Sequence, residues 1–151
     1  MKRVEGDLLA LAEAGQFDVI VHGCNCFHTM GAGIAKAISA RYPQAFEADR
    51  TTPHGDRAKL GSISTAPVDT GQARFTVVNA YTQFHWRGRG VKADYDAIEA
   101  AFSKIATTFP GKRIGYPLIG AGLAGGKWAE IAPRIDRALA GQDHTLVVLP
   151  G

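Results

Sequence analysis

The segment HGCNCFHTMGAGIA occupies residues 22–35 and directly follows the apolar run FDVIV of residues 17–21. Residues 17–22 predict a strand that is buried on both faces, and Ile34 and Ile38 lie on the apolar stripe of a helix predicted over residues 34–41. N–H groups at the start of a helix bind anions when no side chains lie over them. The stretch therefore predicts a buried strand, an anion-binding loop and a helix, in that order.

A second segment of the same kind, PLIGAGLAGG, occupies residues 117–126. It follows a predicted strand over residues 113–116 and leads into a helix that carries Trp128, Ile131 and Ile135. Glycine is enriched in the whole chain, with 18 of 151 residues against a typical share of about 7%. Two such loops side by side could hold a diphosphate between them. The alternative for each loop is that its glycines only permit tight turns.

The other predicted elements continue this alternation of strands and helices. The helix over residues 34–41 is expected to end at Tyr42 and Pro43. The order predicts an α/β sandwich with a mixed sheet and a single domain over residues 1–151. In such sheets ligands bind at the carboxyl ends of the strands, where both glycine loops fall. The other elements are a short strand ending at Val4, a helix over 8–14, strands over 61–68 and 74–82, a helix over 94–109 and a strand over 144–149.

Composition and charge argue against several classes of protein. Basic and acidic residues nearly balance, 17 against 14, so the net charge of +3 gives little indication of a nucleic-acid partner. The apolar runs are far shorter than the roughly 20 residues that span a bilayer, so we expect no membrane partner. The N-terminus shows no secretory signal, and Cys24 and Cys26 stand too close together for a disulfide framework, which favours a cytoplasmic protein. No cofactor is expected.

Two common nucleotide-binding motifs do not fit this sequence. The GAG of residues 31–33 is followed by IAK, so the third glycine of GxGxxG is missing, and no acidic residue ends a second strand about 20 positions further on. The P-loop pattern GxxxxGK[ST] is also absent, because Lys127 is followed by Trp128. A nicotinamide dehydrogenase and a P-loop NTPase are therefore poor fits.

The sequence resembles the macrodomain family of ADP-ribose-binding modules over nearly its whole length. The segments that carry this resemblance are GDL at residues 6–8, the strand and loop over 19–34 with Asn25, and PLIGAG at 117–122 with Trp128 downstream. They are most similar to the branch that contains terminal ADP-ribose glycohydrolases, antitoxin macrodomains that remove ADP-ribose from DNA, and ADP-ribose-1''-phosphate phosphatases. The resemblance implies a three-layer α/β/α macrodomain fold with a mixed six-stranded sheet.

The resemblance also implies which residues bind ADP-ribose. Asp7 would accept a hydrogen bond from the exocyclic amine of adenine, with the backbone of Leu8 beside the ring. The competing role of Asp7 is to cap the first helix. Asn25 would bond the hydroxyls of the distal ribose, and backbone N–H groups of the two loops would bind the two phosphates. The loop residues of this set are Met30, Gly31, Ala32, Gly33 and Ile34 in the first loop and Pro117, Leu118, Ile119, Gly120, Ala121, Gly122 and Leu123 in the second.

The chain departs from the terminal ADP-ribose glycohydrolases at two catalytic positions. That group uses a lysine nucleophile and an aspartate, whereas the matching positions here hold Gln83 and Ala124. An amide cannot form the Schiff base that a lysine forms, and an alanine cannot act as an acid or a base. The catalytic candidates that remain are Asn25, to orient the distal ribose, and His28, to activate water or protonate a leaving oxygen. The alternative is that His28 is a solvated or structural loop histidine.

Two further groups have both a functional and a structural interpretation. His22, Cys24, Cys26 and His28 are plausible zinc ligands by type, but alternate residues of a strand stand about 6.6 Å apart and four of them cannot converge on one ion, so no metal site is expected. A second group interleaves aromatic and basic residues, which is typical either of base stacking in nucleic-acid binding or of a surface loop anchored by its aromatics. Its members are Tyr81, Phe84, His85, Trp86, Arg87, Arg89 and Lys92.

The leading expectation is an enzyme of ADP-ribose metabolism. It would bind ADP-ribose or an ADP-ribosylated substrate, and it would dephosphorylate ADP-ribose-1''-phosphate or remove ADP-ribosyl groups. The alternatives are a non-catalytic ADP-ribose-binding reader and a nucleic-acid-binding protein that uses the aromatic and basic loop. The missing lysine–aspartate pair favours either phosphatase chemistry or binding alone.

Overall fold

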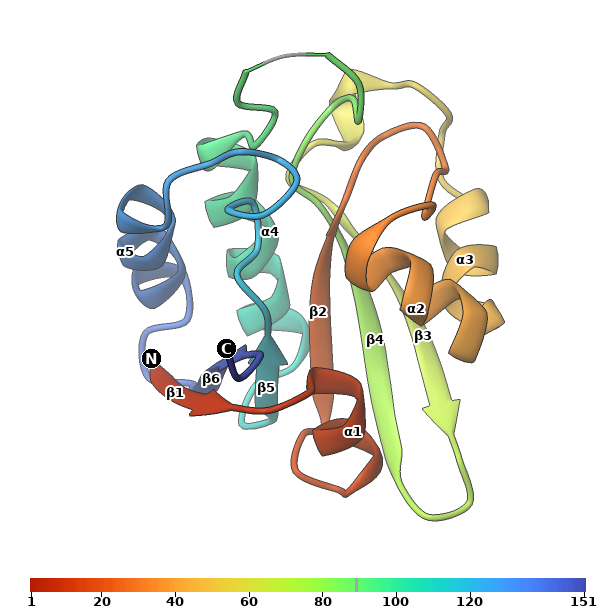
Figure 1. Ribbon diagram of the computed structural model, residues 1–151, viewed down its shortest axis with the longest axis vertical. Coiled ribbons are helices and arrows are strands. Elements are labelled where there is room, and N and C mark those ends of the chain that lie inside the picture. The colour runs from red at the N-terminus through yellow and green to blue at the C-terminus, as the bar shows by residue number, and fades with distance from the viewer. Residues whose placement is uncertain (89) are drawn as a thin grey trace.

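The computed structural model describes residues 1–88 and 90–151 and shows one six-stranded sheet between two layers of helices (Figure 1). The strand order is β1-β6-β5-β2-β4-β3. All neighbouring strands pair in parallel except β3 and β4, so the sheet is mixed. The strands are β1 (Lys2–Glu5), β2 (Val19–Cys24), β3 (Ile63–Asp69), β4 (Arg74–Tyr81), β5 (Arg113–Tyr116) and β6 (Asp143–Val148).

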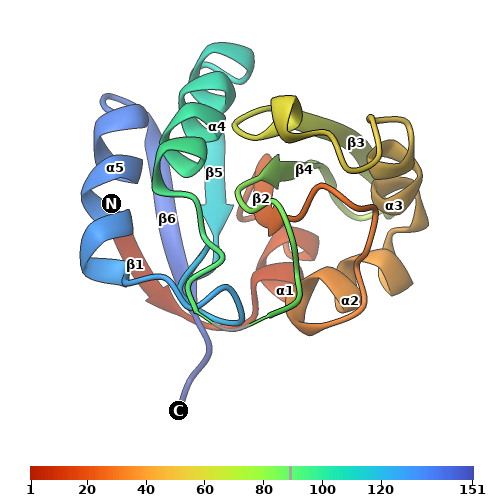
Figure 2. The same ribbon diagram turned by 90° about the horizontal axis from the view of Figure 1, so that it is seen from above.

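Five α-helices and one short 3-10 helix cover the described parts of the sheet. Helices α4 and α5 lie on one face, and α1, α2 and α3 lie on the other (Figures 1 and 2). This arrangement confirms the expected three-layer α/β/α fold with a mixed six-stranded sheet. The helices are α1 (Leu8–Glu13), α2 (Gly33–Arg41), α3 (Pro43–Arg50), α4 (Tyr95–Thr108), α5 (Trp128–Ala138) and the 3-10 helix η1 (Arg57–Lys59).

The side chains on the two faces of the central strand β2 pack into two separate hydrophobic cores. Val19 and Val21 pack with Phe102 of α4, while Ile20 packs with Ile38 of α2 on the opposite face. Successive side chains of a strand point to opposite faces, so a strand buried on both sides needs an apolar residue at every position. The apolar run of residues 17–21 therefore becomes a central strand, although β2 begins and ends two residues later than predicted.

Helix α3 and the short 3-10 helix η1 are the elements that the sequence prediction missed. Pro43 does end α2, as expected, but it is also the first residue of α3, and Tyr42 lies between the two helices. Proline suits the first helical position because that N–H has no partner inside the helix in any case. The segment from α3 to η1 passes over the carboxyl ends of β2 and β4, where Gly55 N–H donates to Cys26 O at 2.6 Å. It therefore belongs to the surroundings of the predicted site.

Loops that follow β2, β4 and β5 gather at the upper end of the sheet in Figure 1, and Figure 2 views them from above. These are the carboxyl ends of three neighbouring parallel strands. Both glycine segments predicted from the sequence lie here. Over the described residues, no helix is long and apolar enough to cross a membrane.

Candidate functional site

The first glycine segment ends in an uncapped helix start. Ala32 is the N-cap of α2 and has no side chain that can accept from the N–H groups of the first turn. Gly33 adopts a φ of 57°, a left-handed conformation that glycine reaches without strain. Within the described chain, the N–H groups of residues 31–34 donate to no protein acceptor. This helix start therefore presents free donors of the kind that bind an anion.

The second glycine segment is a tightly wound loop between β5 and α5. Gly126 N–H donates to Gly120 O at 2.7 Å, and a Cβ placed on Gly126 would lie 2.5 Å from that same oxygen. Gly120 has a φ of 76°, and a Cβ there would lie 2.9 Å from the Cδ1 atom of Ile98. These two glycines are therefore required by the close approach of the backbone to itself and to α4.

Three of the four predicted phosphate donors in this loop are free. Gly120, Gly122 and Leu123 have N–H groups without an acceptor among the residues that the structure describes. The N–H of Ala121 instead donates to Leu118 O at 3.1 Å, so it helps to form the turn. The free N–H groups of the loop therefore come directly before and directly after Ala121 in the sequence.

The two glycine loops meet through Leu123. Its Cδ1 atom lies 3.4 Å from the position that a Cβ on Gly33 would occupy, and Leu123 is 76% exposed. A large apolar side chain this exposed at a loop tip has no role in the core. The tip of the second loop therefore lies against the start of α2, so the two predicted phosphate-binding loops are neighbours.

Asp7 has the structural role that the sequence offered for it. Its Oδ1 atom accepts from Ala10 N–H at 2.9 Å and caps α1, while Leu8 is buried beneath it. Within the described chain, its Oδ2 atom has no hydrogen bond, and Asp7 shares none with either glycine loop. The cap leaves one carboxylate oxygen for another donor, so the adenine role of Asp7 stays a prediction.

Asn25 organises the turn that joins β2 to the first glycine loop. Its Oδ1 accepts from Phe27 N–H at 2.8 Å, and its Nδ2 donates to Thr29 Oγ1 at 2.6 Å and to Thr29 O at 3.2 Å. Both amide protons are therefore used inside the turn, and one lone pair of Oδ1 remains. Asn25 is 8% exposed. In this conformation it can accept from a ribose hydroxyl, but it can donate to one only by releasing Thr29.

His28 lies in the middle of this turn and has an unusual backbone conformation. Its φ of 57° is the only positive value at a non-glycine residue in the described chain. Its Nε2 atom lies 2.7 Å from the carbonyl oxygen of Thr52, and its ring meets that of His54 at 5.2 Å, close to edge-on. A left-handed conformation at a residue with a Cβ costs about 1–3 kcal/mol and persists where the surroundings impose it. Thr52, in the segment that the sequence prediction left without structure, holds His28 here.

A set of hydrogen-bonded side chains lies beneath His28, and we call it the polar network. Lys59 Nζ donates to Thr52 Oγ1 at 2.6 Å, and Tyr81 OH donates to Asp49 Oδ1 at 2.7 Å. Burial raises the pKa of Tyr81, which keeps its hydroxyl protonated. No buried side-chain nitrogen or oxygen atom of the described chain lacks a partner. The network consists of Asp49, Thr52, Lys59, Ser64, Tyr81, Asn79 and His22.

The sequence prediction missed the polar network except for His22 and Tyr81, which it interpreted differently. Asp49 is 1% exposed and Lys59 is 5% exposed, which is rare for charged residues. Their sequence context gave one usable signal: Pro43 followed by Ala45 and Ala48 is compatible with a helix start, and such a helix places Asp49 beside the sheet. The contact between Lys59 and Thr52 had no signal in the sequence.

The structure brings together the two positions that depart from the terminal glycohydrolases. Gln83 pairs with Ala93 in an isolated bridge, and Ala93 N–H donates to Ala124 O at 3.3 Å. The Gln83 side chain donates to His85 O at 2.8 Å, and Ala124 is buried. Neither side chain offers a nucleophile or a proton at this edge. The nearby Lys92 does not replace the missing lysine, since its Nζ atom turns to its own loop and lies 3.4 Å from Gly90 O.

The four side chains of the possible zinc set point to different neighbours. His22 Nε2 lies 2.6 Å from Asn79 Oδ1 and 3.6 Å from Cys24 Sγ, whereas Cys26 Sγ lies 3.6 Å from Gln83 O and His28 turns to Thr52. Burial lowers the pKa of His22 and raises the pKa of both thiols. In the part of the chain that the structure describes, no three His, Cys, Asp or Glu residues are placed to hold a metal ion.

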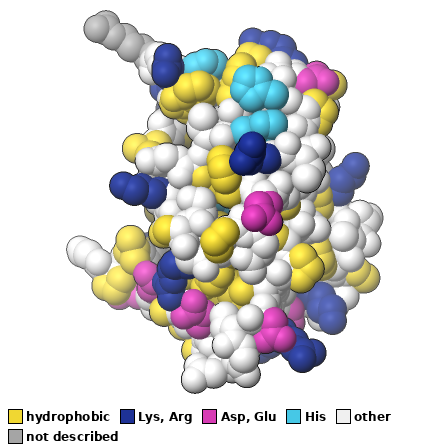
Figure 3. All heavy atoms as spheres, turned by 90° about the vertical axis from the view of Figure 1, so that its right-hand side faces the viewer, with side chains coloured by type: hydrophobic (Ala, Val, Ile, Leu, Met, Phe, Trp, Pro, Cys, Tyr) yellow, Lys and Arg dark blue, Asp and Glu magenta, His cyan; other side chains and the backbone are white. Residues whose placement is uncertain are grey.

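The aromatic residues after β4 pack around Phe27. Phe84 and His85 each have their ring centroids 4.9 Å from that of Phe27, and the rings of His85 and Trp86 stack at 4.3 Å. Figure 3 shows histidine and hydrophobic side chains gathered with basic ones near the upper end of this face. The packing matches the interpretation of a surface loop anchored by its aromatics. Arg89 lies outside the described residues.

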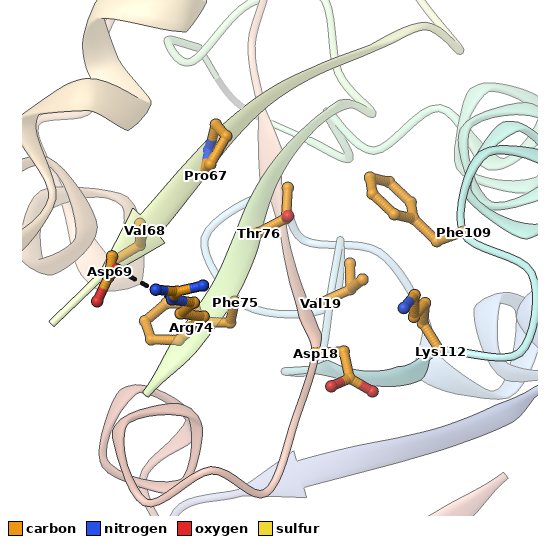
Figure 4. A pocket seen from close by; sticks show the side chains of 10 residues that line it. All are labelled: Asp18, Val19, Pro67, Val68, Asp69, Arg74, Phe75, Thr76, Phe109 and Lys112. Carbon is orange, nitrogen blue, oxygen red and sulfur yellow. Dashed lines mark hydrogen bonds and ion pairs between the residues drawn. The ribbon is translucent and has the colours of Figure 1, made fainter. Parts of the chain in front are cut away.

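A hollow of about 550 Å³ lies at the end of the sheet opposite to the glycine loops (Figure 4). It opens at the amino-terminal ends of β2 and β4 and contains none of the predicted site residues. Arg74 pairs with Asp69 at 3.0 Å, and the hydrogen bond from Arg113 lowers the pKa of Asp18 to about 2. The lining residues are Asp18, Val19, Pro67, Val68, Asp69, Arg74, Phe75, Thr76, Phe109 and Lys112.

Comparison with known proteins agrees with this architecture. The family model described as Macro domain matches residues 21–135. An uncharacterized 17.5 kDa protein in the tk-vs intergenic region of Enterobacteria phage T4 is 36% identical over 141 residues, which cover 90% of this chain and 88% of the phage protein. A macrodomain protein from Streptomyces coelicolor is 30% identical, with a TM-score of 0.76 and 99% of both chains covered.

A further solved structure, Thermosipho africanus DarTG in complex with ADP-ribose, has the same fold. It is 16% identical, with a TM-score of 0.74, and the match covers 99% of this chain and 42% of that one. The family match spans both glycine loops and the turn that carries Asn25 and His28. This chain belongs to the Macro domain family.

Proposed function

We propose that the protein binds ADP-ribose with the diphosphate between the two glycine loops. The observation that carries this proposal is that the Leu123 side chain of the second loop reaches Gly33 of the first, while both loops hold N–H groups without an acceptor among the described residues. One uncapped helix start binds one anion, so two adjoining donor groups suit two linked phosphates. The ADP-ribose complex of the Thermosipho africanus protein, which has the same fold, supports the same ligand.

The two ends of the ligand would then have different surroundings. Adenine would lie at the start of α1, where Asp7 Oδ2 accepts from its amine and the backbone of Leu8 flanks the ring. The distal ribose would lie at the turn of residues 25–29, where Asn25 has a lone pair left for a hydroxyl. The remaining lining would come from Met30 and from the apolar residues 117–119.

We further propose that the protein hydrolyses a bond at the distal ribose, with His28 as the base. Because the lysine and aspartate of the terminal glycohydrolases are replaced by Gln83 and Ala124, a covalent lysine adduct has no residue to form it here. The neutral imidazole of His28 has one N–H and one lone pair, so it can accept a proton from water as a general base. The substrates to test are ADP-ribose-1''-phosphate and an ADP-ribosyl group on a macromolecule.

Calorimetric titration with ADP-ribose, with AMP and NAD as controls, tests the binding. We expect micromolar affinity that is selective for ADP-ribose. Turnover of the two substrates then tests the chemistry, and His28→Ala should lower it by about 100-fold or more while ADP-ribose affinity is retained. Absence of ADP-ribose binding would contradict the whole proposal. Binding without turnover of either substrate would assign the protein the role of a non-catalytic reader.

A further inference from the structure

The surroundings of His28 determine which of its two ring nitrogens carries the proton. The Nε2 atom faces two oxygens of Thr52, the carbonyl oxygen at 2.7 Å and Oγ1 at 3.3 Å. A carbonyl oxygen has no proton and can only accept. A neutral imidazole has one N–H and one lone pair, so the carbonyl oxygen at 2.7 Å requires the proton on Nε2, and the Thr52 hydroxyl supports that form only while it presents a lone pair.

The hydroxyl proton of Thr52 is already engaged. Thr52 Oγ1 donates to Asp49 O at 2.6 Å and accepts from Lys59 Nζ at 2.6 Å. An ammonium group is a donor only, so Lys59 keeps a lone pair of this hydroxyl occupied and cannot reverse the bond. The hydroxyl has a single proton, and its nearer acceptor is Asp49 O at 2.6 Å rather than Tyr81 OH at 3.4 Å. Toward His28 the hydroxyl therefore presents a lone pair.

Lys59 is held firmly in this role. It is 5% exposed, donates a second bond to Pro53 O at 2.9 Å, and lies 4.4 Å from the centroid of the Tyr81 ring. The 3-10 helix that carries it is capped by Asp56, whose Oδ1 accepts from Ala58 N–H at 2.8 Å. A buried ammonium is costly unless its donors are satisfied, and here an oxygen, a carbonyl and an aromatic face satisfy them.

We propose that Lys59 and Thr52 are positioning residues that hold His28 with its proton on Nε2, so that Nδ1 is the atom that takes a proton from water at the distal ribose. This inference rests on the proposed function, in which His28 is the base. Nδ1 has no hydrogen-bond partner in the described chain. The same bonds from Thr52 maintain the left-handed backbone at His28. The carbonyl oxygen can only accept and the hydroxyl directs its proton to Asp49, so Nδ1 is left as the base.

For ADP-ribose-1''-phosphate the step balances without any further reactant. The oxygen of one water bonds to phosphorus, and the bond from phosphorus to the C1'' oxygen breaks with its electron pair on that oxygen. One proton of the water passes to Nδ1 of His28, and the leaving oxygen takes a proton from solvent water, to which Nδ1 later returns the proton that it accepted. The products are ADP-ribose and phosphate, and His28 returns to its neutral form when Nδ1 gives up its proton.

The tautomer is measured directly by the ¹⁵N chemical shifts of the His28 ring in the intact protein, with and without ADP-ribose. We expect a single neutral form with the proton on Nε2. In Lys59→Met, Thr52 Oγ1 loses its fixed donor and is free to turn its proton toward Nε2, so a fraction with the proton on Nδ1 should appear. Adding Thr52→Val to Lys59→Met removes that hydroxyl and should restore the Nε2–H form.

Turnover of ADP-ribose-1''-phosphate gives the second readout. Lys59→Met should lower kcat by about tenfold with KM nearly unchanged, because ligand binding uses the loops and the lost interaction acts only on the base. Ile105→Val, a buried change in α4 away from the site, is the control for a loss of stability alone and should leave kcat unchanged.

The outcomes separate the two proposals. A proton on Nδ1 in the wild-type protein would overturn the inference, and so would a folded Lys59→Met protein with an unchanged tautomer and kcat. If the wild-type protein binds ADP-ribose but has no turnover, the proposed hydrolysis fails, while the ring shifts still decide whether Lys59 and Thr52 set the tautomer of His28.

Discussion

The two halves of the predicted site differ in the groups that form them: backbone N–H groups in one half and side chains in the other. The glycine loops offer backbone N–H groups, and their positions depend on the absence of side chains at Gly120 and Gly126. The turn around His28 is held by Thr52, whose side chain belongs to the polar network; the other members of that network come from α3, η1, β2, β3 and β4. A backbone site can be encoded in one short stretch of sequence. A side-chain site of this kind exists only when distant segments have folded together, so mutations should affect the two halves differently.

Among the tests of this difference, removal of the Tyr81 hydroxyl should have the largest effect, and that effect should be on stability. Tyr81→Phe leaves buried Asp49 without the donor at 2.7 Å and removes one of the two partners of Ser64, at 2.8 Å, so the free energy of unfolding should fall by about 2–3 kcal/mol. ADP-ribose affinity, measured on the folded variant by calorimetry, should stay close to wild type because the loops are untouched. Chemical denaturation measures the stability. A loss of affinity as large as the loss of stability would show that the two halves are one unit.

The next largest effect is expected from Gly120→Ala, compared with Gly111→Ala. Both glycines have similar left-handed φ values, 76° and 74°, so both variants carry a backbone cost of about 1 kcal/mol or more. A Cβ at Gly111 meets nothing within 4 Å, whereas a Cβ at Gly120 lies 2.9 Å from the Cδ1 atom of Ile98. We expect about tenfold weaker ADP-ribose binding for Gly120→Ala only, which corresponds to about 1.4 kcal/mol.

Comparison of Gly120→Ala with Gly111→Ala separates the general cost of a strained backbone from the specific effect of a side chain in the second glycine loop. Equal losses of ADP-ribose affinity in the two variants would mean that a general loss of stability, and not the shape of the loop, weakens binding. Wild-type affinity in Gly120→Ala would contradict the role of the second loop in the site.

The same contrast explains what could be predicted from the sequence. The buried strand, both glycine loops and the helices after them could be predicted because glycine content, apolar runs and caps such as Asp94 are local signals. Helix α3 was missed because Pro43 was interpreted only as the end of α2, although proline is also favoured at the start of a helix. With α3 missing, the environment of His28 could not be predicted.

The smallest effect is expected from acidification, and it should act on buried histidines such as His22 of the polar network and not on the glycine loops. Burial lowers the pKa of His22, so the folded state holds this imidazole neutral while the unfolded chain binds a proton below about pH 6.5. The stability that depends on neutral His22 is therefore present above that pH and is lost as the pH falls, by at most about 1.4 kcal/mol per pH unit. His22→Gln keeps a donor for Asn79 Oδ1 and should flatten this part of the stability curve.

Burial also lowers the pKa of His144, so that residue contributes a similar slope, and His144→Gln measures its share separately. The N–H groups of the glycine loops do not titrate, so ADP-ribose affinity should change by less than about twofold between pH 7 and pH 6. Calorimetry at both pH values and denaturation from pH 8 to pH 5 measure the two responses. Affinity that falls in parallel with stability in the wild-type protein, but not in His22→Gln, would show that the polar network also controls the loops. The division between a backbone half and a side-chain half of the site would then be wrong.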